Sequence, residues 1–411
     1  MVVDELVRQN PQWRGKQLAD DTVKRCIEPV LLNELSEDII TGLIGMRRVG
    51  KTTLMQRLID KVDENTVYYS FDIEQVPVVD VLDAYFEEIV NEDAEEAEQT
   101  YVFLDEVQKT DQWSDHVKAY HDQYDQIKFV ITGSSSAMIR HGSGESLVGR
   151  INLHHLTPYL FREYLRAIEV DVPKPNLADT PVPRNAKTIK AKFPAYLETG
   201  GFPELIDVDE MRRRDRLKDA VDLTLYRDIV NLFNIGRPGL LEALFRAITS
   251  QSGNKVNYNK LGRDLDAQYK TVRKYVDTLT QSFLLTKSKR FEDNTLKTYK
   301  KRPKLYAGDH AFCTLEHTEE GLRAEKVAHN HLRVLGDTGY WETQRGEVDI
   351  ILKQPSTTSA YEVKYQEQPE ETKSMEAFRR EHPDIDLTMI TKDTRGDNTI
   401  PLWQLLTHVK P

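Results

Sequence analysis

The sequence GMRRVGKT at residues 45–52 determines what kind of domain begins this chain. It matches the pattern G-x-x-x-x-G-K-[S/T] in full, with an apolar strand pattern at 39–44 before it and a helical pattern at 51–60 after it. In such a loop the glycines permit a tight turn whose backbone N–H groups point at phosphate oxygens, and the N-terminus of the following helix adds a favourable dipole. The alternative, a chance match in a glycine-containing turn, leaves the flanking strand and helix patterns unexplained.

The residue types in this loop indicate which ligand it holds. Lys51 can reach the β- and γ-phosphates of a nucleotide, and Thr52 offers a hydroxyl to Mg²⁺. We therefore predict ATP and Mg²⁺ as cofactors. The predicted nucleotide-binding residues are Gly45, Arg47, Arg48, Gly50, Lys51, Thr52 and Thr53.

Two carboxylates follow the apolar strand pattern at 101–104. We predict that Asp105 holds the Mg²⁺ together with Thr52, and that Glu106 is the base that polarises the attacking water. Acidic residues at the end of a strand are common in proteins. Their place downstream of the phosphate-binding loop favours the functional interpretation.

Two further residues are candidates for catalysis. Ser134 lies in the hydroxyl-rich turn after the strand pattern at 128–132, where a polar side chain can sense the γ-phosphate or orient the lytic water. Arg150 can offer its guanidinium to the transferring phosphate, in the same subunit or in a neighbour. A simple turn and a surface arginine are the alternatives, and Arg140 competes for the second role. The predicted catalytic residues are Lys51, Glu106, Ser134 and Arg150.

The pattern around this site favours an α/β domain. Short apolar segments alternate with helical ones, which is typical of a parallel sheet wrapped by helices. After Thr157 the chain becomes mainly helical, and a strand and helix alternation returns in the last hundred or so residues. In the first part the expected strands are 39–44, 67–71, 101–104 and 128–132, and the expected helices are 51–60, 80–92 and 112–124.

A basic segment in the middle of the chain predicts contact with DNA. Residues 255–304 hold 14 Lys or Arg against 5 Asp or Glu, a local net charge of +9, although the whole chain carries −11. Residues 258–279 show a helix, turn and helix pattern, whose second helix would enter the major groove. The alternative is a packing or dimerisation surface with a solvated basic face. The predicted DNA-binding residues are Lys270, Thr271, Arg273, Lys274, Lys289, Arg290, Lys301 and Arg302.

The C-terminal part contains a carboxylate and lysine pattern. A hairpin formed by strands at 346–352 and 360–365 would place Asp349, Glu362 and Lys364 together, and Glu325 on an upstream helix could complete the set. Two carboxylates and a lysine can hold Mg²⁺ against a scissile phosphate, and the spacing resembles that of the PD-(D/E)xK nucleases. The alternative is an edge strand that alternates solvated and buried side chains.

Several motifs together resemble one family. GMRRVGKTTL, YVFLDEVQ, ITGSSS, SLVGR, YLETGGFPE and LYRDIV are similar to the prokaryotic AAA-type ATPases that carry a DUF4143 C-terminal region. The resemblance implies a RecA-like/AAA P-loop domain with a parallel sheet, a helical region with a winged helix, and a small restriction-nuclease-like α/β domain. We therefore expect a P-loop ATPase domain at 1–165, a linker and helical region at 166–237, a winged helix at 238–306 and a nuclease-like domain at 307–411.

Composition limits the classes of protein that remain. No apolar run is long enough to span a bilayer, and Cys26 and Cys313 form no CxxC pair, so we expect a cytoplasmic protein without a membrane partner. Nine acidic residues and no basic ones lie between Asp80 and Glu98. The expected partners are ATP, DNA and, by analogy with AAA proteins, further copies of the same chain.

Three functions are compatible with these observations. The first is an ATPase that engages DNA through its winged helix and cleaves it at the C-terminal site. The second is an ATP-dependent signalling switch that processes no nucleic acid. The third is a transcription regulator whose nuclease-like domain is an inactive interaction module.

Overall fold

The apolar segments of the N-terminal part form one parallel sheet in the computed structural model, which describes residues 2–62, 65–133, 147–292, 301–316, 318–344 and 346–411. The chain divides into two compact units, Met1–Thr157 and Pro158–Pro411. Among the described residues, no helix is both long and apolar enough to cross a membrane.

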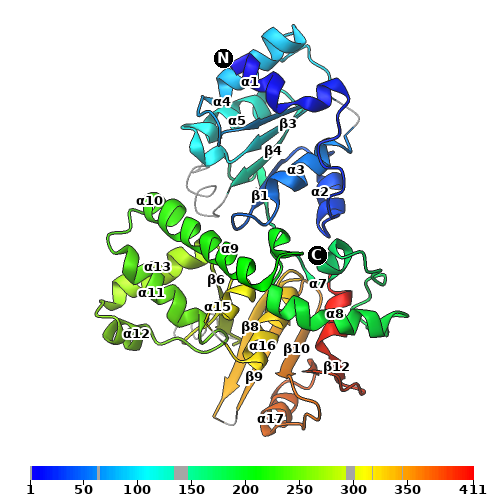
Figure 1. Cartoon of the computed structure of the whole chain (residues 1–411), viewed down its shortest axis with the longest axis vertical. Coiled ribbons are helices and arrows are strands. Elements are labelled where there is room, and N and C mark those ends of the chain that lie inside the picture. Colours follow the sequence, from blue (N-terminus) through cyan, green and yellow to red (C-terminus); the bar gives the residue numbers. More distant parts are fainter. Residues whose placement is uncertain (1, 63–64, 134–146, 293–300, 317, 345) are drawn as a thin grey trace. The chain divides into compact units, whose positions relative to one another are not determined.

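The first unit contains a five-stranded sheet in the order β2-β3-β4-β1-β5, and every pairing in it is parallel. The central strands are buried along their whole length, as expected for a sheet that helices cover on both faces. In Figure 1, α4 and α5 lie to one side of this sheet and α2 and α3 to the other. The strands are β1 (Ile40–Ile44), β2 (Asn65–Ser70), β3 (Thr100–Asp105), β4 (Ile127–Gly133) and β5 (Ile151–His155). The helices are α1 (Val2–Gln9), α2 (Glu28–Glu34), α3 (Lys51–Ile59), α4 (Val78–Asp83), α5 (Trp113–Gln123) and the π-helix η2 (Ala84–Val90), with short 3₁₀ turns η1 (Pro11–Arg14) and η3 (Val107–Lys109).

Strand order positions the nucleotide site. β4 lies between β1, which leads into the phosphate-binding loop, and β3, which ends in Asp105. The carboxyl ends of these parallel strands meet at one edge, where α/β sheets bind ligands. The expected α/β class and parallel sheet are confirmed. The strand at 151–155, which pairs with β1, was not among the predicted strands.

The second unit joins a helical region to a seven-stranded mixed sheet in the order β12-β11-β10-β9-β8-β6-β7. Its strands are β6 (Leu285–Arg290), β7 (Lys304–Ala307), β8 (Asp337–Thr343), β9 (Gly346–Lys353), β10 (Thr358–Lys364), β11 (Asp386–Thr391) and β12 (Thr399–Pro401). Its helices are α7 (Phe161–Ala167), α8 (Ala186–Thr199), η4 (Pro203–Leu205), α9 (Glu210–Asp222), η5 (Leu223–Ile229), α10 (Val230–Leu232), α11 (Pro238–Thr249), α12 (Tyr258–Asp264), α13 (Tyr269–Gln281), α15 (Ala311–Leu315), α16 (Glu320–Leu332), α17 (Lys373–Glu381) and α18 (Leu402–His408).

Two apolar clusters cover this sheet. One joins α7, α8, α16 and α18 to alternate residues of the central strands, such as Ile350 and Tyr361. The other lies under α17 and includes Trp341 and Ile351. The sheet core is therefore enclosed by helices from both ends of the unit.

The sheet also joins segments that we expected in separate domains. β6 follows the helices α12 and α13, which we call the helix pair. It forms an antiparallel pair with β7, and its last two residues pair in parallel with β8. The expected boundary between 306 and 307 falls inside β7, and the boundary between 165 and 166 falls inside α7. The division into four domains stays a prediction.

Candidate functional site

The loop between β1 and α3 has the backbone conformation that a phosphate-binding loop requires. Arg48 and Gly50 adopt left-handed φ angles of 67° and 93°. A Cβ atom on Gly45 would lie 2.4 Å from the backbone oxygen of Leu156, so no side chain fits there. Backbone N–H groups in such a turn form an anion-binding concavity at the N-terminus of α3.

Lys51 begins α3 and its ammonium points back into the loop. Its Nζ atom lies 3.1 Å from the backbone oxygen of Gly45 and 3.3 Å from that of Met46. It also lies 3.6 Å from the Glu106 carboxylate, and both side chains are largely buried. The ammonium of Lys51 is thus held between the phosphate-binding loop and the end of β3.

The carboxylate of Asp105 is the centre of a hydrogen-bond cluster at the ends of three strands. Thr52 Oγ1 donates to it over 2.6 Å and the Tyr68 hydroxyl over 3.1 Å, while Thr132 Oγ1 donates to its other oxygen. Burial and the charge of Asp105 raise the pKa of Tyr68 far above its usual value, so its hydroxyl stays protonated and donates. The cluster brings together Thr52 and Asp105, the two predicted metal ligands.

Glu106 is held in an unusual conformation at the same edge. Its φ of 55° lies in the left-handed region, which costs a non-glycine residue about 1–3 kcal/mol. The Thr132 hydroxyl accepts its backbone N–H over 2.9 Å, and the Gln108 side-chain amide donates to its carboxylate. These contacts aim the carboxylate toward Lys51 and the loop.

The residues present suit ATP with Mg²⁺. A threonine hydroxyl and a carboxylate are hard oxygen ligands of the kind that Mg²⁺ takes together with phosphate oxygens and water. Thr52 and Asp105 would hold the ion, and the loop backbone with Lys51 would hold the phosphates. Arg47 is half-buried and Arg48 is exposed in the loop, and Thr53 follows in the first turn of α3.

Three further residues, Thr132, Tyr68 and Arg25, were not predicted but take part in this site. Thr132 and Tyr68 were not predicted because each lies in an otherwise apolar strand pattern. A polar residue at the end of such a strand is the signal that could have identified Thr132. Arg25 braces the loop from outside, since its guanidinium donates to the backbone oxygens of Val49 over 2.8 Å and of Thr157 over 2.6 Å. No local pattern marks Arg25.

The structure places Arg150 away from the loop. Its carbonyl accepts the N–H of Ile40, so it lies where β1 and β5 begin, whereas the loop follows the end of β1. Its guanidinium forms two hydrogen bonds with Asp122, 2.5 and 3.0 Å long. A role of Arg150 toward the nucleotide of its own subunit is therefore incompatible with this position. Ser134 and Arg140 lie outside the described residues.

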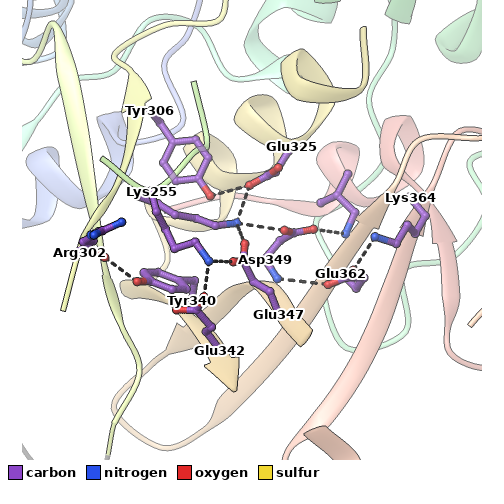
Figure 2. A network of polar contacts seen from close by, with 12 residues as sticks. Lys255, Arg302, Tyr306, Glu325, Tyr340, Glu342, Glu347, Asp349, Glu362 and Lys364 are labelled. Carbon is purple, nitrogen blue, oxygen red and sulfur yellow. Dashed lines mark hydrogen bonds and ion pairs between the residues drawn. The ribbon is translucent and has the colours of Figure 1, made fainter. Parts of the chain in front are cut away.

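A second polar cluster brings the four predicted nuclease-type residues together in the second unit (Figure 2). Asp349 accepts the backbone N–H of Val363 over 3.0 Å, and Glu362 accepts that of Asp349 over 3.3 Å. These two contacts form where the β9–β10 ladder ends, next to a shift of register between β8 and β9. Bulges of this kind re-aim side chains. Lys364 lies 2.6 Å from Glu362.

The same cluster contains residues that we did not predict. Lys304 Nζ lies 3.1 Å from both Glu325 and Asp349 and 2.5 Å from Glu347. The Tyr306 hydroxyl donates to Glu325 over 2.8 Å. Burial, followed by the charge of Asp349, raises the pKa values of Glu325 and Glu362 to about 7.

The predicted DNA-binding residues divide into two groups. Lys270, Arg273 and Lys274 are exposed on α13, Thr271 is half-buried beside them, and Arg273 is 3.9 Å from Asp277. Lys289, Lys301 and Arg302 are also exposed. Arg290 is different, because it is 3.1 Å from Glu292 and donates to the backbone oxygen of Glu342. The guanidinium of Arg290 thus binds groups of the protein itself and does not form part of an exposed basic surface.

Two family models match parts of the chain. Residues 37–165 match an AAA domain, which identifies the first site as that of a P-loop AAA domain. Residues 190–319 match a domain of unknown function, DUF8612, and not the DUF4143 region that we expected.

An uncharacterized protein of Haemophilus influenzae is 25% identical over 62% of this chain, and one of Methanocaldococcus jannaschii is 28% identical over 54%. The matched regions are 63% and 49% of the length of these relatives.

Solved structures with partial likeness include a Walker-type ATPase and a branch migration motor. The Walker-type ATPase of Pyrococcus abyssi matches with a TM-score of 0.45 and 15% identity, over 74% of this chain and 98% of that one. The RuvB Holliday junction branch migration motor of Thermotoga maritima matches with a TM-score of 0.32 and 17% identity, over 66% of this chain and 92% of that one.

Proposed function

We propose that the first unit binds ATP as its Mg²⁺ complex and hydrolyses it. The observation that carries this proposal is the continuous set of contacts from Thr52 through Asp105 and Thr132 to Glu106. It links the groups that would hold the metal to the carboxylate that would activate water, beside a loop built for phosphates.

Each residue has a part in the proposed reaction. Lys51 would exchange its backbone carbonyl contacts for phosphate oxygens, and Thr52 and Asp105 would hold the metal, which would neutralise charge on the phosphates. Glu106 orients the attacking water and accepts its proton. The Thr132 hydroxyl holds the carboxylate of Asp105 and the backbone of Glu106 in fixed positions relative to each other.

Two substitutions test this proposal. Lys51→Ala should abolish the binding of a fluorescent ATP analogue or the turnover of ATP. Glu106→Gln should still bind the analogue but hydrolyse ATP at no more than about one hundredth of the wild-type rate. Lys61→Ala, an exposed lysine just after α3, is the matched control and should behave as the wild type. Unchanged hydrolysis by Lys51→Ala would refute the central proposal.

We propose that Arg150 acts on the nucleotide of a neighbouring copy of the chain. Its exposed position at the sheet edge supports this arrangement. The specific activity of the wild type should then rise with protein concentration, and Arg150→Ala should lose that rise. An activity independent of concentration would leave Arg150 as a surface partner of Asp122.

The second unit is proposed to engage DNA through α13 and the β6–β7 hairpin, in the manner of a winged helix. The exposed cations near the start of α13 support this proposal. Reversing Arg273 and Lys274 to Glu should weaken duplex binding and flatten its salt dependence. Lys187→Glu with Lys192→Glu, two exposed lysines on α8, is the matched control. Equal affinity of both double variants would favour the alternative of an ATP-dependent switch with a protein partner.

The C-terminal sheet is proposed to be a nuclease-like module. The closeness of Asp349, Glu362 and Lys364 supports this proposal at the level of the fold. Whether such a module cleaves DNA depends on which cation its carboxylates hold.

A further inference from the structure

The polar cluster of Figure 2, here called the nuclease-like cluster, already holds a cation between three of its carboxylates. Lys304 lies at the first position of β7, and its ammonium is within 3.1 Å of Glu325, Glu347 and Asp349. Its side chain is only 3% exposed. This is the place that a divalent metal would take in a site built from Glu325 and Asp349.

The oxygens that would bind a metal are engaged as well. One oxygen of Asp349 faces Lys304 and the other accepts the N–H of Val363. One oxygen of Glu362 faces Lys364 and the other accepts the N–H of Asp349. Within the part of the chain that the structure describes, no three His, Cys, Asp or Glu side chains form a group that could hold a metal ion.

Lys304 is fixed by its backbone. It pairs with Ser288 in the β6–β7 ladder on one side and forms an isolated bridge with Lys255 on the other. Moving the ammonium away would take the ion pair from the largely buried carboxylates of Glu325 and Asp349, which is strongly unfavourable, whereas Glu347 would keep its contact with Lys255. The ammonium is therefore a permanent component of the cluster.

We propose that Lys304 takes the place of the metal ion in the nuclease-like site, so that this site binds no Mg²⁺ and the second unit does not cleave DNA. Lys304 is a structural counter-ion that holds α16, β7 and β9 together through Glu325, Glu347 and Asp349. The residues present do not suit a metal, although the spacing of Asp349, Glu362 and Lys364 suggests one. The inference concerns the second unit alone and stands whether or not the first unit hydrolyses ATP.

The first experiment measures Mn²⁺ binding by electron paramagnetic resonance, without nucleotide. The full chain carries Asp105→Asn, which removes the carboxylate ligand at the P-loop. Adding Asp349→Asn should leave the amount of bound Mn²⁺ unchanged, because the wild-type cluster binds none. A bound ion that is lost on adding Asp349→Asn would overturn the inference. This comparison needs no variant at Lys304.

The second experiment exchanges the ammonium for a metal. Lys304→Met removes the charge at similar length and should lower the Tm of the second unit, because the carboxylates lose their counter-ion. Mn²⁺ at about 100 times its Kd should then raise that Tm by at least about 5 °C, with no such rise for the wild type. Lys255→Met is the matched control, since it removes a lysine that pairs with Glu347 but leaves Lys304 in place.

The third experiment tests cleavage directly. Wild-type protein should leave linear and branched DNA intact with Mg²⁺ or Mn²⁺, with and without ATP. Metal-dependent cleavage by the wild type that Lys364→Ala and Asp349→Asn both abolish would overturn the inference. An inactive wild type with a bound Mn²⁺ assigned to Asp349 would overturn it equally, since the proposal is about the metal.

Discussion

Thr132 organises the nucleotide site through a single hydroxyl. It donates to Asp105 and accepts the backbone N–H of Glu106, so it connects the metal-binding carboxylate to the residue proposed as base. This positioning role differs from the one predicted for Ser134, which was to sense the γ-phosphate or to orient the lytic water and which stays a prediction. Strand order places Thr132 opposite Asp105, because β3 and β4 are neighbours in the sheet.

Thr132→Val should therefore impair hydrolysis more than binding. The substitution conserves volume and removes both hydrogen bonds, and a loss of about 1–3 kcal/mol corresponds to roughly 5- to 150-fold in kcat. The dissociation constant of ATP should change by less than about threefold, because the loop and Lys51 are intact. Thr132→Ser keeps the hydroxyl and is the control. A kcat equal to that of the wild type would show that Thr132 has no positioning role.

Gly45→Ala tests the backbone of the loop. The new Cβ atom would lie 2.4 Å from the oxygen of Leu156, so the loop must shift and we expect the free energy of unfolding to fall by about 1–3 kcal/mol, with weaker ATP binding. Gly239→Ala in α11 is a suitable control, because nothing lies within 4 Å of its Cβ position. Denaturant unfolding of both variants measures the difference, and equal stability would contradict the packing argument.

At the scale of elements, α16 is docked through buried histidines. His331 Nδ1 lies 2.8 Å from the backbone oxygen of Val327, so that nitrogen carries the proton, and Nε2 accepts the N–H of Phe161 at the start of α7 over 2.9 Å. Burial lowers the pKa of His331 to about 3. The neutral ring thus joins two helices that lie far apart in sequence.

This contact predicts acid sensitivity of the second unit. Between pH 6.5 and 3 the unfolded chain binds a proton at His331 that the folded chain does not, so the free energy of unfolding should fall as the pH is lowered through this window. His331→Gln keeps a donor and an acceptor but does not titrate, so its stability should fall less steeply with acid. Parallel slopes for the two proteins, measured by denaturant unfolding at several pH values, would exclude His331 as a source.

At the scale of the molecule, a continuous seven-stranded sheet connects distant parts of the second unit. β6 leaves the helix pair and joins β8, so the proposed DNA-binding helices and the nuclease-like cluster share a hydrogen-bonded framework. Lys304 reinforces this connection, because it comes from the hairpin and pairs with carboxylates of α16 and β9.

A core substitution in β9 should therefore loosen the helix pair as well. Ile351 is 1% exposed, and Ile351→Ala should lower the free energy of unfolding of this unit by about 2–5 kcal/mol. Hydrogen exchange should speed up in α13 together with β9, since both belong to one cooperative unit. Lys353→Ala, an exposed residue of the same strand, is the control. Faster exchange confined to β9 would show that the helix pair is a separate unit.

The sequence by itself determined the features that depend on neighbours in the chain. The spacing of Gly45, Gly50 and Lys51 specifies a loop conformation within a few residues, and strand and helix periods are likewise local. The hairpin that places Asp349 beside Glu362 was predictable for the same reason, because its two strands are joined by a short turn.

Only the tertiary structure decided which distant residues meet. The order of the parallel strands brought Thr132 and Tyr68 to Asp105 and left Arg150 at the opposite edge of the sheet. The pairing of β6 with β8, together with the β6–β7 hairpin, placed Lys304 among carboxylates from two other elements. Strand order and long-range pairing follow from how whole apolar faces pack, which no short window of sequence contains. Charge balance around Glu325 and Asp349 is therefore a property of the fold, whereas the motif alone suggested a metal at the place where the fold puts Lys304.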